Sequence, residues 1–347
     1  MDRRSRFIAA VIIILALFSI LILSACDELG MIINPESGNN GGNTRTPQAK
    51  PTPGDNTGDK QETSTKPPAD TPDDIIVVLP DIPVPTASGV NVEKNGQAVV
   101  DFSNTQDGYI MAKYTESADM KIKLLITVPD GVQYTYSLKP KRDFEVFPLS
   151  GGDGTYEIGI YKQVEGTRYS KVLSTTIKVT LTDEFAPFLR PNQYVNFDIN
   201  SEAVRKAAEL TARTETFIDN VSAIYHFVIS SVSYDVELAQ TVQSDYLPDI
   251  DDVMARGKGI CFDYASLMAA MLRSQSIPTK LVIGYTGDVY HAWISVYCEE
   301  DGWLDNIIFF DGHTWRLVDP TFAANGTSQG VAAYIGDGTN YTVKYLH

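Results

Sequence analysis

The chain has 347 residues, and its 28 Lys and Arg against 44 Asp and Glu give a formal net charge of −16. This deficit of cationic side chains argues against a nucleic-acid partner, because phosphate contacts supply most of the affinity in that class of protein. The sequence has three cysteines and no Cys-x-x-Cys pair, which argues against a disulfide-stapled scaffold and against a structural zinc site.

The N-terminal segment has the pattern of a secretory signal peptide. Residues 1–6 carry a net positive charge, and residues 7–23 are apolar apart from Ser19. The small residues Ser24 and Ala25 then precede Cys26. This pattern predicts a signal peptide over residues 1–25. An uncleaved membrane anchor is the alternative, because the apolar run approaches the ~20 residues that span a bilayer.

The position of Cys26 directly after Leu23-Ser24-Ala25 resembles the lipobox of bacterial lipoproteins. The resemblance implies that the Cys26 thiol receives a diacylglyceryl group and that Cys26 becomes the mature N-terminus. We therefore expect a lipid-anchored protein on the outer face of the bacterial cytoplasmic membrane, extracellular or periplasmic. The lipid would then bind the protein to the membrane. The alternative, an uncleaved anchor, would also place the rest of the chain outside the cytoplasmic membrane.

A polar segment follows the anchor. Between residues 34 and 74 the only members of the hydrophobic set are Ala49 and Ala69, and Gly, Asn, Thr, Pro, Asp and Lys dominate. Such a segment cannot bury enough apolar surface to offset the entropy of folding. We therefore predict a disordered tether over residues 26–75, whose ~40 flexible residues would span roughly 35 Å.

The sequence pattern of the next segment is typical of an all-β domain. Seven short strand candidates are separated by turn signals, and they are Gln97–Ser103, Gly108–Thr115, Lys121–Pro129, Val132–Lys139, Phe144–Pro148, Thr155–Lys162 and Tyr169–Leu181. Asp130-Gly131 is typical of a tight hairpin turn. This pattern predicts an immunoglobulin-like or fibronectin-like β-sandwich over residues 88–182. It contains no cluster of ionisable residues suited to chemistry, so a structural spacer and a binding module both remain open.

From residue 183 to 347 the pattern changes to helices followed by strands. Asn200-Ser201-Glu202 predicts an N-cap for a helix over Ala203–Thr214. After two glycines, Cys261 opens a segment that is apolar nearly all round, which predicts a buried helix. Pro278 ends that helix. Strands are then predicted over three segments, namely Lys280–Tyr285, Tyr290–Cys298 and Thr314–Val318.

The expected position of Cys261 at a helix N-terminus suits nucleophilic chemistry. The macrodipole and the free N–H groups of a helix N-terminus stabilise a thiolate and can hold a developing oxyanion. Acyl chemistry also needs an imidazole that exchanges protons with the leaving group, and the imidazole needs an orienting acceptor. His291 lies in one predicted strand and Asp319 closes the next, so two adjacent strands would place the pair side by side.

Three motifs in order resemble the transglutaminase-like superfamily, a papain-related cysteine enzyme fold. They are Gly259-Ile260-Cys261-Phe262-Asp263-Tyr264-Ala265, His291-Ala292-Trp293 and Trp315-Arg316-Leu317-Val318-Asp319-Pro320-Thr321-Phe322. The resemblance covers about residues 201–322. It implies an α+β core in which Cys261 is the nucleophile, His291 is the general base and acid, and Asp319 orients the imidazole.

Three further residues lie near these motifs. Two of them have both a functional and a structural interpretation, and for the third we expect no disulfide to Cys261. Tyr234 is either an oxyanion donor or a packed core residue. Trp293 shares a strand face with His291, and it is either a groove wall over the imidazole or a core residue. Cys298 lies seven residues from His291, so it faces the opposite side of the strand and is too far from Cys261 for a disulfide.

The sequence thus predicts a surface, lipid-anchored cysteine enzyme that acts on amide bonds of a protein or peptide substrate, with cell-envelope peptides among the candidates. Hydrolysis is favoured over crosslinking, because no sequence feature marks a site for an amine acceptor. A protein-crosslinking acyl transferase and a catalytically silent binding or scaffold protein are the alternatives. The motifs imply no metal and no cofactor.

Overall fold

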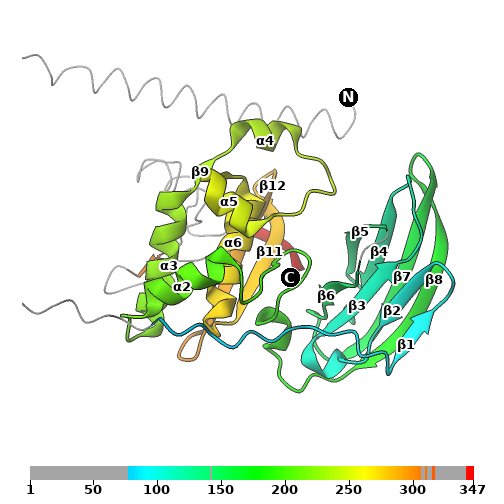
Figure 1. The fold of residues 1–347 in the computed structure, drawn as a ribbon, viewed down its shortest axis with the longest axis horizontal. Coiled ribbons are helices and arrows are strands. Elements are labelled where there is room, and N and C mark those ends of the chain that lie inside the picture. The colour runs from blue at the N-terminus through cyan, green and yellow to red at the C-terminus, as the bar shows by residue number, and fades with distance from the viewer. Residues whose placement is uncertain (1–76, 141–142, 306–308, 311–314, 317–340) are drawn as a thin grey trace, which may run out of the picture. The chain divides into compact units, whose positions relative to one another are not determined.

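The computed structural model describes residues 77–140, 143–305, 309–310, 315–316 and 341–347 (Figure 1). The predicted signal peptide, the tether over residues 26–75, Cys26 and Asp319 all lie outside these ranges. Residues 76–347 form one compact unit. Of the helices in the described ranges, none combines the length and the apolar character needed to span a bilayer.

The first half of this unit consists of two four-stranded antiparallel sheets. One sheet has the order β1 (Val92–Lys94), β2 (Ala98–Asp101), β3 (Tyr109–Tyr114) and β6 (Glu145–Pro148). The other has the order β5 (Gln133–Leu138), β4 (Ile122–Thr127), β7 (Gly154–Glu165) and β8 (Arg168–Val179). A short 3-10 helix, η2 (Thr105–Asp107), precedes β3.

The two sheets share one hydrophobic core. Strand β4 shows how the sequence builds it, because Ile122, Leu124 and Ile126 alternate with more exposed residues and all three are buried. All seven predicted strands are present. An eighth, β1, was not predicted, because Val92–Lys94 pairs along the edge of β2 without an apolar alternation of its own.

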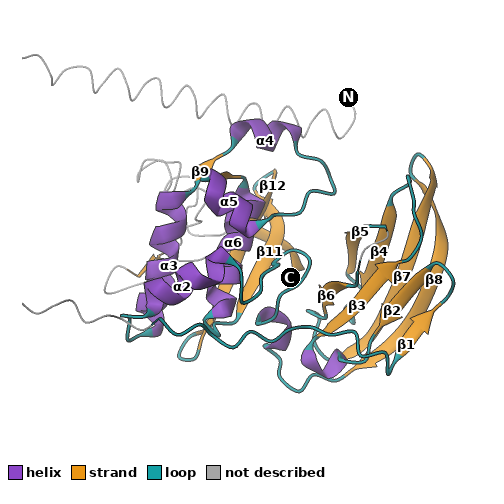
Figure 2. Ribbon diagram, viewed as in Figure 1, coloured by secondary structure: helices purple, strands orange, loops and turns teal. Residues whose placement is uncertain are grey.

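The second half contains the helices α2 (Glu202–Thr211), α3 (Phe217–Ser231), α4 (Val236–Thr241), α5 (Ile250–Arg256) and α6 (Cys261–Ser274), after the 3-10 helix η3 (Ala186–Phe188). A four-stranded antiparallel sheet follows, in the order β13 (Gly302–Leu304), β12 (Val289–Cys298), β11 (Thr279–Thr286) and β16 (Tyr341–Leu346). Helix α6 packs against β11 and β12 (Figure 2). The mixed α+β core that the sequence predicts is therefore present.

Helix α6 is the centre of this half. Nearly every residue of α6 is buried, and its apolar side chains join those of α3, β11 and β12 in one cluster. The predicted all-round burial of this helix is confirmed. Because the helix is enclosed along its length, its first residue is held at the edge of a rigid core rather than on a loop.

One local expectation is corrected, since helix α2 ends at Thr211 rather than Thr214. Ser201 is at the N-cap position, as predicted, but its side chain makes no cap hydrogen bond to the helix, and its hydroxyl accepts the Asp198 N–H. Instead, the Asp251 carboxylate accepts the Ala203 N–H at 3.1 Å. A carboxylate from helix α5 thus accepts a first-turn N–H that the Ser201 side chain does not.

The strand predicted over Thr314–Val318, which leads to Asp319, is described only in part. The described part of it, β15 (Trp315–Arg316), pairs with β14 (Phe309–Phe310). The pairing partners of β12 in the structure are β11 and β13. The adjacency of the His291 strand and the Asp319 strand stays a prediction, because residues 317–319 lie outside the described residues.

Candidate active site

The segment before Cys261 is fixed by main-chain pairing. Helix α5 ends at Gly257, whose positive φ of 61° provides the left-handed C-cap. Strand β10 (Lys258–Gly259) then pairs in parallel with β9 (Ser233–Tyr234). The flanking Asp235 N–H donates to the Gly259 carbonyl at 2.9 Å. The chain therefore enters α6 along a defined path.

Cys261 is the first residue of α6, as the sequence predicts, and it is a half-buried free thiol. The N-cap position is occupied by Ile260, a residue type that is unfavourable there because its side chain cannot accept the N–H groups of the first turn. The N-terminus of α6 thus keeps donors that a Ser or Asp at the N-cap would have engaged. Those donors lie where an anion on Cys261 or on a bound substrate would be stabilised.

Two other residues of the cysteine motif anchor the first turn of α6. The Tyr264 hydroxyl, which is fully buried, donates to the Val232 carbonyl at 2.6 Å, just before β9. The Asp263 carboxylate accepts the Ile260 N–H at 2.8 Å. The motif therefore supplies the nucleophile together with the side chains that hold the backbone around it.

His291 lies near the start of β12, where it is opposite Gly284 of β11 in the register. Its side chain is buried, and Trp293 is on the same strand face, as predicted. The two rings are stacked with centroids 6.1 Å apart and an interplanar angle of 20°. Trp293 is fully buried, which fits core packing; its role as a groove wall stays a prediction.

The next residue, Ala292, faces the other side of β12 and packs in the core cluster that contains α6. Helix α6, which begins at Cys261, and β12, which carries His291, are in direct contact. The alternation along β12 places the His291 side chain on the face opposite Ala292. The hydrogen bond between the Cys261 and His291 side chains, which a catalytic dyad requires, stays a prediction. Asp319, the third predicted member, lies outside the described residues, so its role also stays a prediction.

Tyr234 is placed beside this segment by the pairing of β9 with β10. Its backbone lies opposite Gly259, two residues before Cys261. Its side chain is half-buried and packs against the helical core cluster. This placement agrees with the packed interpretation, and donation to an oxyanion stays a prediction. Cys298, at the far end of β12, is buried, and both it and Cys261 are free cysteines in the structure.

Two tyrosines near the nucleophile were not predicted. Tyr290 is partly exposed, and burial raises its pKa, with further contributions from Tyr194, Tyr345, Tyr285 and Cys261. Tyr290 therefore lies within electrostatic range of the thiol. The Tyr194 ring meets the Phe262 ring edge-on, with centroids 5.1 Å apart, directly beside Cys261. Tyr290 could have been noticed from the sequence, because it directly precedes His291. Tyr194 is far from Cys261 in the sequence, and only the fold brings it to the neighbouring residue Phe262.

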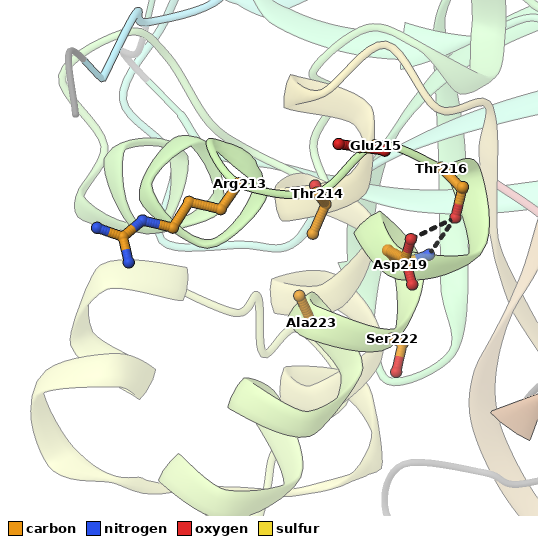
Figure 3. Close-up of a pocket in the computed structure, with 7 residues that line it drawn as sticks. All are labelled: Arg213, Thr214, Glu215, Thr216, Asp219, Ser222 and Ala223. Carbon is orange, nitrogen blue, oxygen red and sulfur yellow. Dashed lines mark hydrogen bonds between the residues drawn. The ribbon is translucent and has the colours of Figure 1, made fainter. Parts of the chain in front are cut away.

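A separate depression of about 510 Å³ lies at the start of α3 (Figure 3). It is lined by Arg213, Thr214, Glu215, Thr216, Asp219, Ser222 and Ala223. Its central polar pair is a helix cap, because the Thr216 hydroxyl oxygen accepts the Asp219 N–H at 3.1 Å and lies 2.6 Å from the Asp219 carboxylate. Arg213 extends away from this pair. The depression contains none of the predicted site residues.

In the part of the chain that the structure describes, no group of three or more His, Cys, Asp or Glu side chains is arranged to hold a metal ion.

Comparison with known proteins identifies relatives of this region. Residues 204–306 match the model of the Transglutaminase-like superfamily. The protein YebA of Bacillus subtilis (strain 168), which is described as uncharacterized, is 28% identical over 171 residues. The match covers 43% of this chain and 22% of YebA, so the chain spans less than a quarter of that relative.

Among solved structures, the chain is similar to "a Putative Cysteine Protease from Cytophaga hutchinsonii", with 19% identity, a TM-score of 0.32, and coverage of 69% of this chain and 82% of that one. It is also similar to red sea bream transglutaminase, with 12% identity, a TM-score of 0.27, and coverage of 63% and 49%. Both TM-scores are too low for either structure to bear on activity. The family match spans α6, Cys261 and His291. Residues 204–306 thus form a domain of the transglutaminase-like superfamily.

Proposed function

We propose that this protein is a cysteine enzyme that acts on amide bonds of proteins or peptides, with Cys261 as nucleophile, His291 as general base and acid, and Asp319 as the orienting partner of the imidazole. The observation that carries the proposal is the position of Cys261. It is a half-buried free thiol on the first residue of a buried helix whose N-cap offers no side-chain acceptor. That combination suits a thiolate and an oxyanion at the same place.

In the proposed reaction, the imidazole takes the thiol proton and the thiolate sulfur attacks the carbonyl carbon of the substrate amide. The C–N bond then breaks, and the leaving nitrogen takes the proton back from the imidazolium. This leaves a thioester on Cys261. Water, deprotonated by His291, attacks the thioester carbon, and the sulfur leaves with the proton restored by the imidazolium. A primary amine in place of water would give a crosslinked amide.

The position of the acidic segment after β12 favours water over an amine. Glu299, Glu300 and Asp301 are exposed and form the turn between β12 and β13. His291 is near the opposite end of β12, roughly 25 Å away at ~3.3 Å per residue. The carboxylates that would attract a lysine ammonium group are therefore remote from the proposed imidazole. Hydrolysis remains the favoured reaction.

The test is to incubate the protein with cell-envelope peptides and Gln-containing peptides in the presence of a labelled primary amine, followed by mass spectrometry. New peptide ends or deamidated Gln that are lost in Cys261→Ala but kept in Cys298→Ala support hydrolysis. Amine incorporation lost in Cys261→Ala, without cleavage, shows that the reaction is crosslinking instead. Products that persist in Cys261→Ala overturn the proposed nucleophile.

We also propose that the two-sheet half is an immunoglobulin-like or fibronectin-like sandwich. Its chain crosses between the sheets from β3 to β4, from β5 to β6 and from β6 to β7, as a Greek key does. The Tyr156 hydroxyl on β7 lies 3.0 Å from the Leu149 carbonyl and 2.8 Å from the Gly152 carbonyl, just after β6. A tyrosine that returns its hydroxyl to the preceding corner is a hallmark of these sandwiches.

The proposed location is the outer face of the bacterial cytoplasmic membrane, with a lipid on Cys26 as the anchor. The support is the sequence of residues 1–26, in which a positive start and an apolar run precede a lipobox-like segment.

A further inference from the structure

Asp263 is a buried acid that the proposed triad does not use. It lies in the first turn of α6, two residues after Cys261, and its side chain is fully buried. One carboxylate oxygen accepts the Ile260 N–H at 2.8 Å, and the other accepts the Tyr246 hydroxyl at 2.6 Å. Both oxygens are therefore engaged, one by the backbone next to the nucleophile and one by a distant side chain.

Tyr246 reaches Asp263 from the connection between α4 and α5, 17 residues earlier in the chain. The Arg256 guanidinium, which pairs with Asp252 at 2.7 Å, also interacts electrostatically with Tyr246 and with Asp263. The charged and titratable groups around the carboxylate are thus Tyr246, Arg256 and Asp235. They join the connection between α4 and α5 to the start of α6.

The backbone before Cys261 passes close to Asp263. A Cβ atom added to Gly259 would lie 2.6 Å from the Asp263 Cβ, which is closer than real Cβ atoms approach. Gly259 thus lets the chain run against the carboxylate-bearing residue, and the Ile260 N–H points to the Asp263 oxygen. The path of residues 259–261 depends on this close approach.

We infer that Asp263 and Tyr246 are positioning residues for the proposed nucleophile: the buried carboxylate, held by the tyrosine hydroxyl, fixes the turn that carries Cys261 at the N-terminus of α6. This inference rests on the proposed role of Cys261. Of the two hydrogen bonds of a capping box, only the one from the Ile260 N–H to the Asp263 carboxylate is present, because the Ile260 side chain cannot accept an N–H. The first turn is thereby held by a bond to the N-cap N–H, which leaves the donors that follow it available.

The surroundings of Asp263 have opposing effects on the pKa of its carboxyl group. Burial raises its pKa, while the hydrogen bonds from Tyr246 and Ile260 and the charge of Arg256 oppose the rise. Burial, and next the bond to Asp263, raise the pKa of Tyr246, so its hydroxyl remains a donor at neutral pH. Loss of the Tyr246 hydroxyl would leave one oxygen of a buried carboxylate without its donor.

The test compares Tyr246→Phe, Asp263→Ala and Asp263→Asn by the rate of Cys261 alkylation between pH 5 and 9. Tyr246→Phe and Asp263→Ala should slow labelling at pH 7 by roughly 3- to 10-fold and move the profile to higher pH, because a frayed turn loses the helix N-terminal stabilisation of the thiolate. Asp263→Asn keeps an acceptor for the Ile260 N–H, so it should stay closer to the unsubstituted protein. Unchanged profiles in both Tyr246→Phe and Asp263→Ala would overturn the inference.

Matched controls separate positioning from general destabilisation. Tyr156→Phe and Asp101→Asn each alter a buried hydrogen-bonded side chain of the β-sheet half, where the Asp101 carboxylate accepts the N–H groups of Gly89 and Ser103. Both should lower the unfolding temperature and leave the Cys261 profile unchanged. A shift in these controls as large as in Tyr246→Phe would show that the effect is only structural.

Hydrogen exchange distinguishes failure of this inference from failure of the proposed function. The Ile260 amide should lose protection in Asp263→Ala and in Tyr246→Phe, whether or not Cys261 is a nucleophile. An unreactive Cys261 together with this loss would remove the proposed function while the positioning of the turn stands. Retained protection in both variants would remove the positioning itself.

Discussion

The indole of Trp293 is stacked against the imidazole of His291 on one face of β12, with ring centroids 6.1 Å apart. The far edge of the indole lies over Gly284 of β11, where an added Cβ would come within 2.8 Å of Trp293 Cη2 and would overlap the Thr342 carbonyl. The backbone of Gly284 thus provides the space in which the indole fits. The indole that stacks on His291 therefore occupies space that a side chain at position 284 would fill.

Replacement of Gly284 by Ala should therefore displace the Trp293 ring or strand β16. We expect a loss of about 1–3 kcal/mol in the free energy of unfolding, which is typical of overpacking, and slower alkylation of Cys261. Denaturant unfolding and iodoacetamide labelling measure the two effects. Gly96→Ala is the control, because nothing lies within 4 Å of an added Cβ there. A Gly284→Ala protein as stable as Gly96→Ala would contradict the close packing.

Cys261 should react with a thiol alkylator at least about 10-fold faster than Cys298 at neutral pH, since Cys261 is half-buried at a helix N-terminus and Cys298 is buried at a strand end. Peptide mapping after a short iodoacetamide pulse measures both rates in one sample. His291→Ala should slow Cys261 and leave Cys298 unchanged. Equal, slow labelling of both cysteines that is insensitive to His291→Ala would falsify the activated pair.

His347 should make the free energy of unfolding decrease as the pH falls below about 6.5. Burial, and then the nearby Arg273 charge, lower its pKa to about 3, and its Nδ1 lies 3.0 Å from the Tyr136 hydroxyl. The unfolded chain takes up a proton near the ordinary pKa of 6.5 while the folded protein does not, so this stability is complete above pH 6.5 and declines as the pH falls toward 3. The loss at pH 5 is about 2 kcal/mol.

Urea unfolding at pH 7 and pH 5 checks this prediction, with His347→Gln as the comparison. The variant should be less stable at pH 7 and should lose less on acidification. A pH dependence that is identical in the two proteins would show that other groups are responsible.

Lipidation is tested on the protein extracted from membranes. We expect an intact mass that corresponds to a chain beginning at a diacylglyceryl-modified Cys26, because residues 1–25 have the pattern of a cleaved signal. Cys26→Ser should abolish the modification and the processing. A chain that begins at Met1 with an unmodified Cys26 would support the uncleaved anchor.

Regular features of the fold were predictable because they follow from local periodicity. The alternation in strands such as β4, and the all-round apolar character of α6, appear in the structure where the sequence places them. Strand β1 was missed because Val92–Lys94 lacks such an alternation and forms only by pairing with an edge. The helix start at Cys261 was predictable from the glycines before it.

Only the residues of the site that lie in the sequence motifs could be predicted. Cys261 and His291 lie on the expected elements, whereas the bond between Asp263 and Tyr246 joins residues that no local pattern connects. Gly284 does not need a positive φ, so its importance comes from the indole of Trp293 on a neighbouring strand and is visible only in three dimensions. Tertiary contacts of this kind leave no trace in hydropathy or spacing.

The pairing of β9 with β10 closes residues 235–257 into an excursion whose two ends are joined at a stem. Part of this excursion is fixed to the core, because Ile250 and Val253 of α5 are buried beside α6 and the Tyr246 hydroxyl bonds to Asp263. Helix α4, by contrast, has no buried residue. Changes of length around α4 would therefore leave the stem, and with it the path into Cys261, in place.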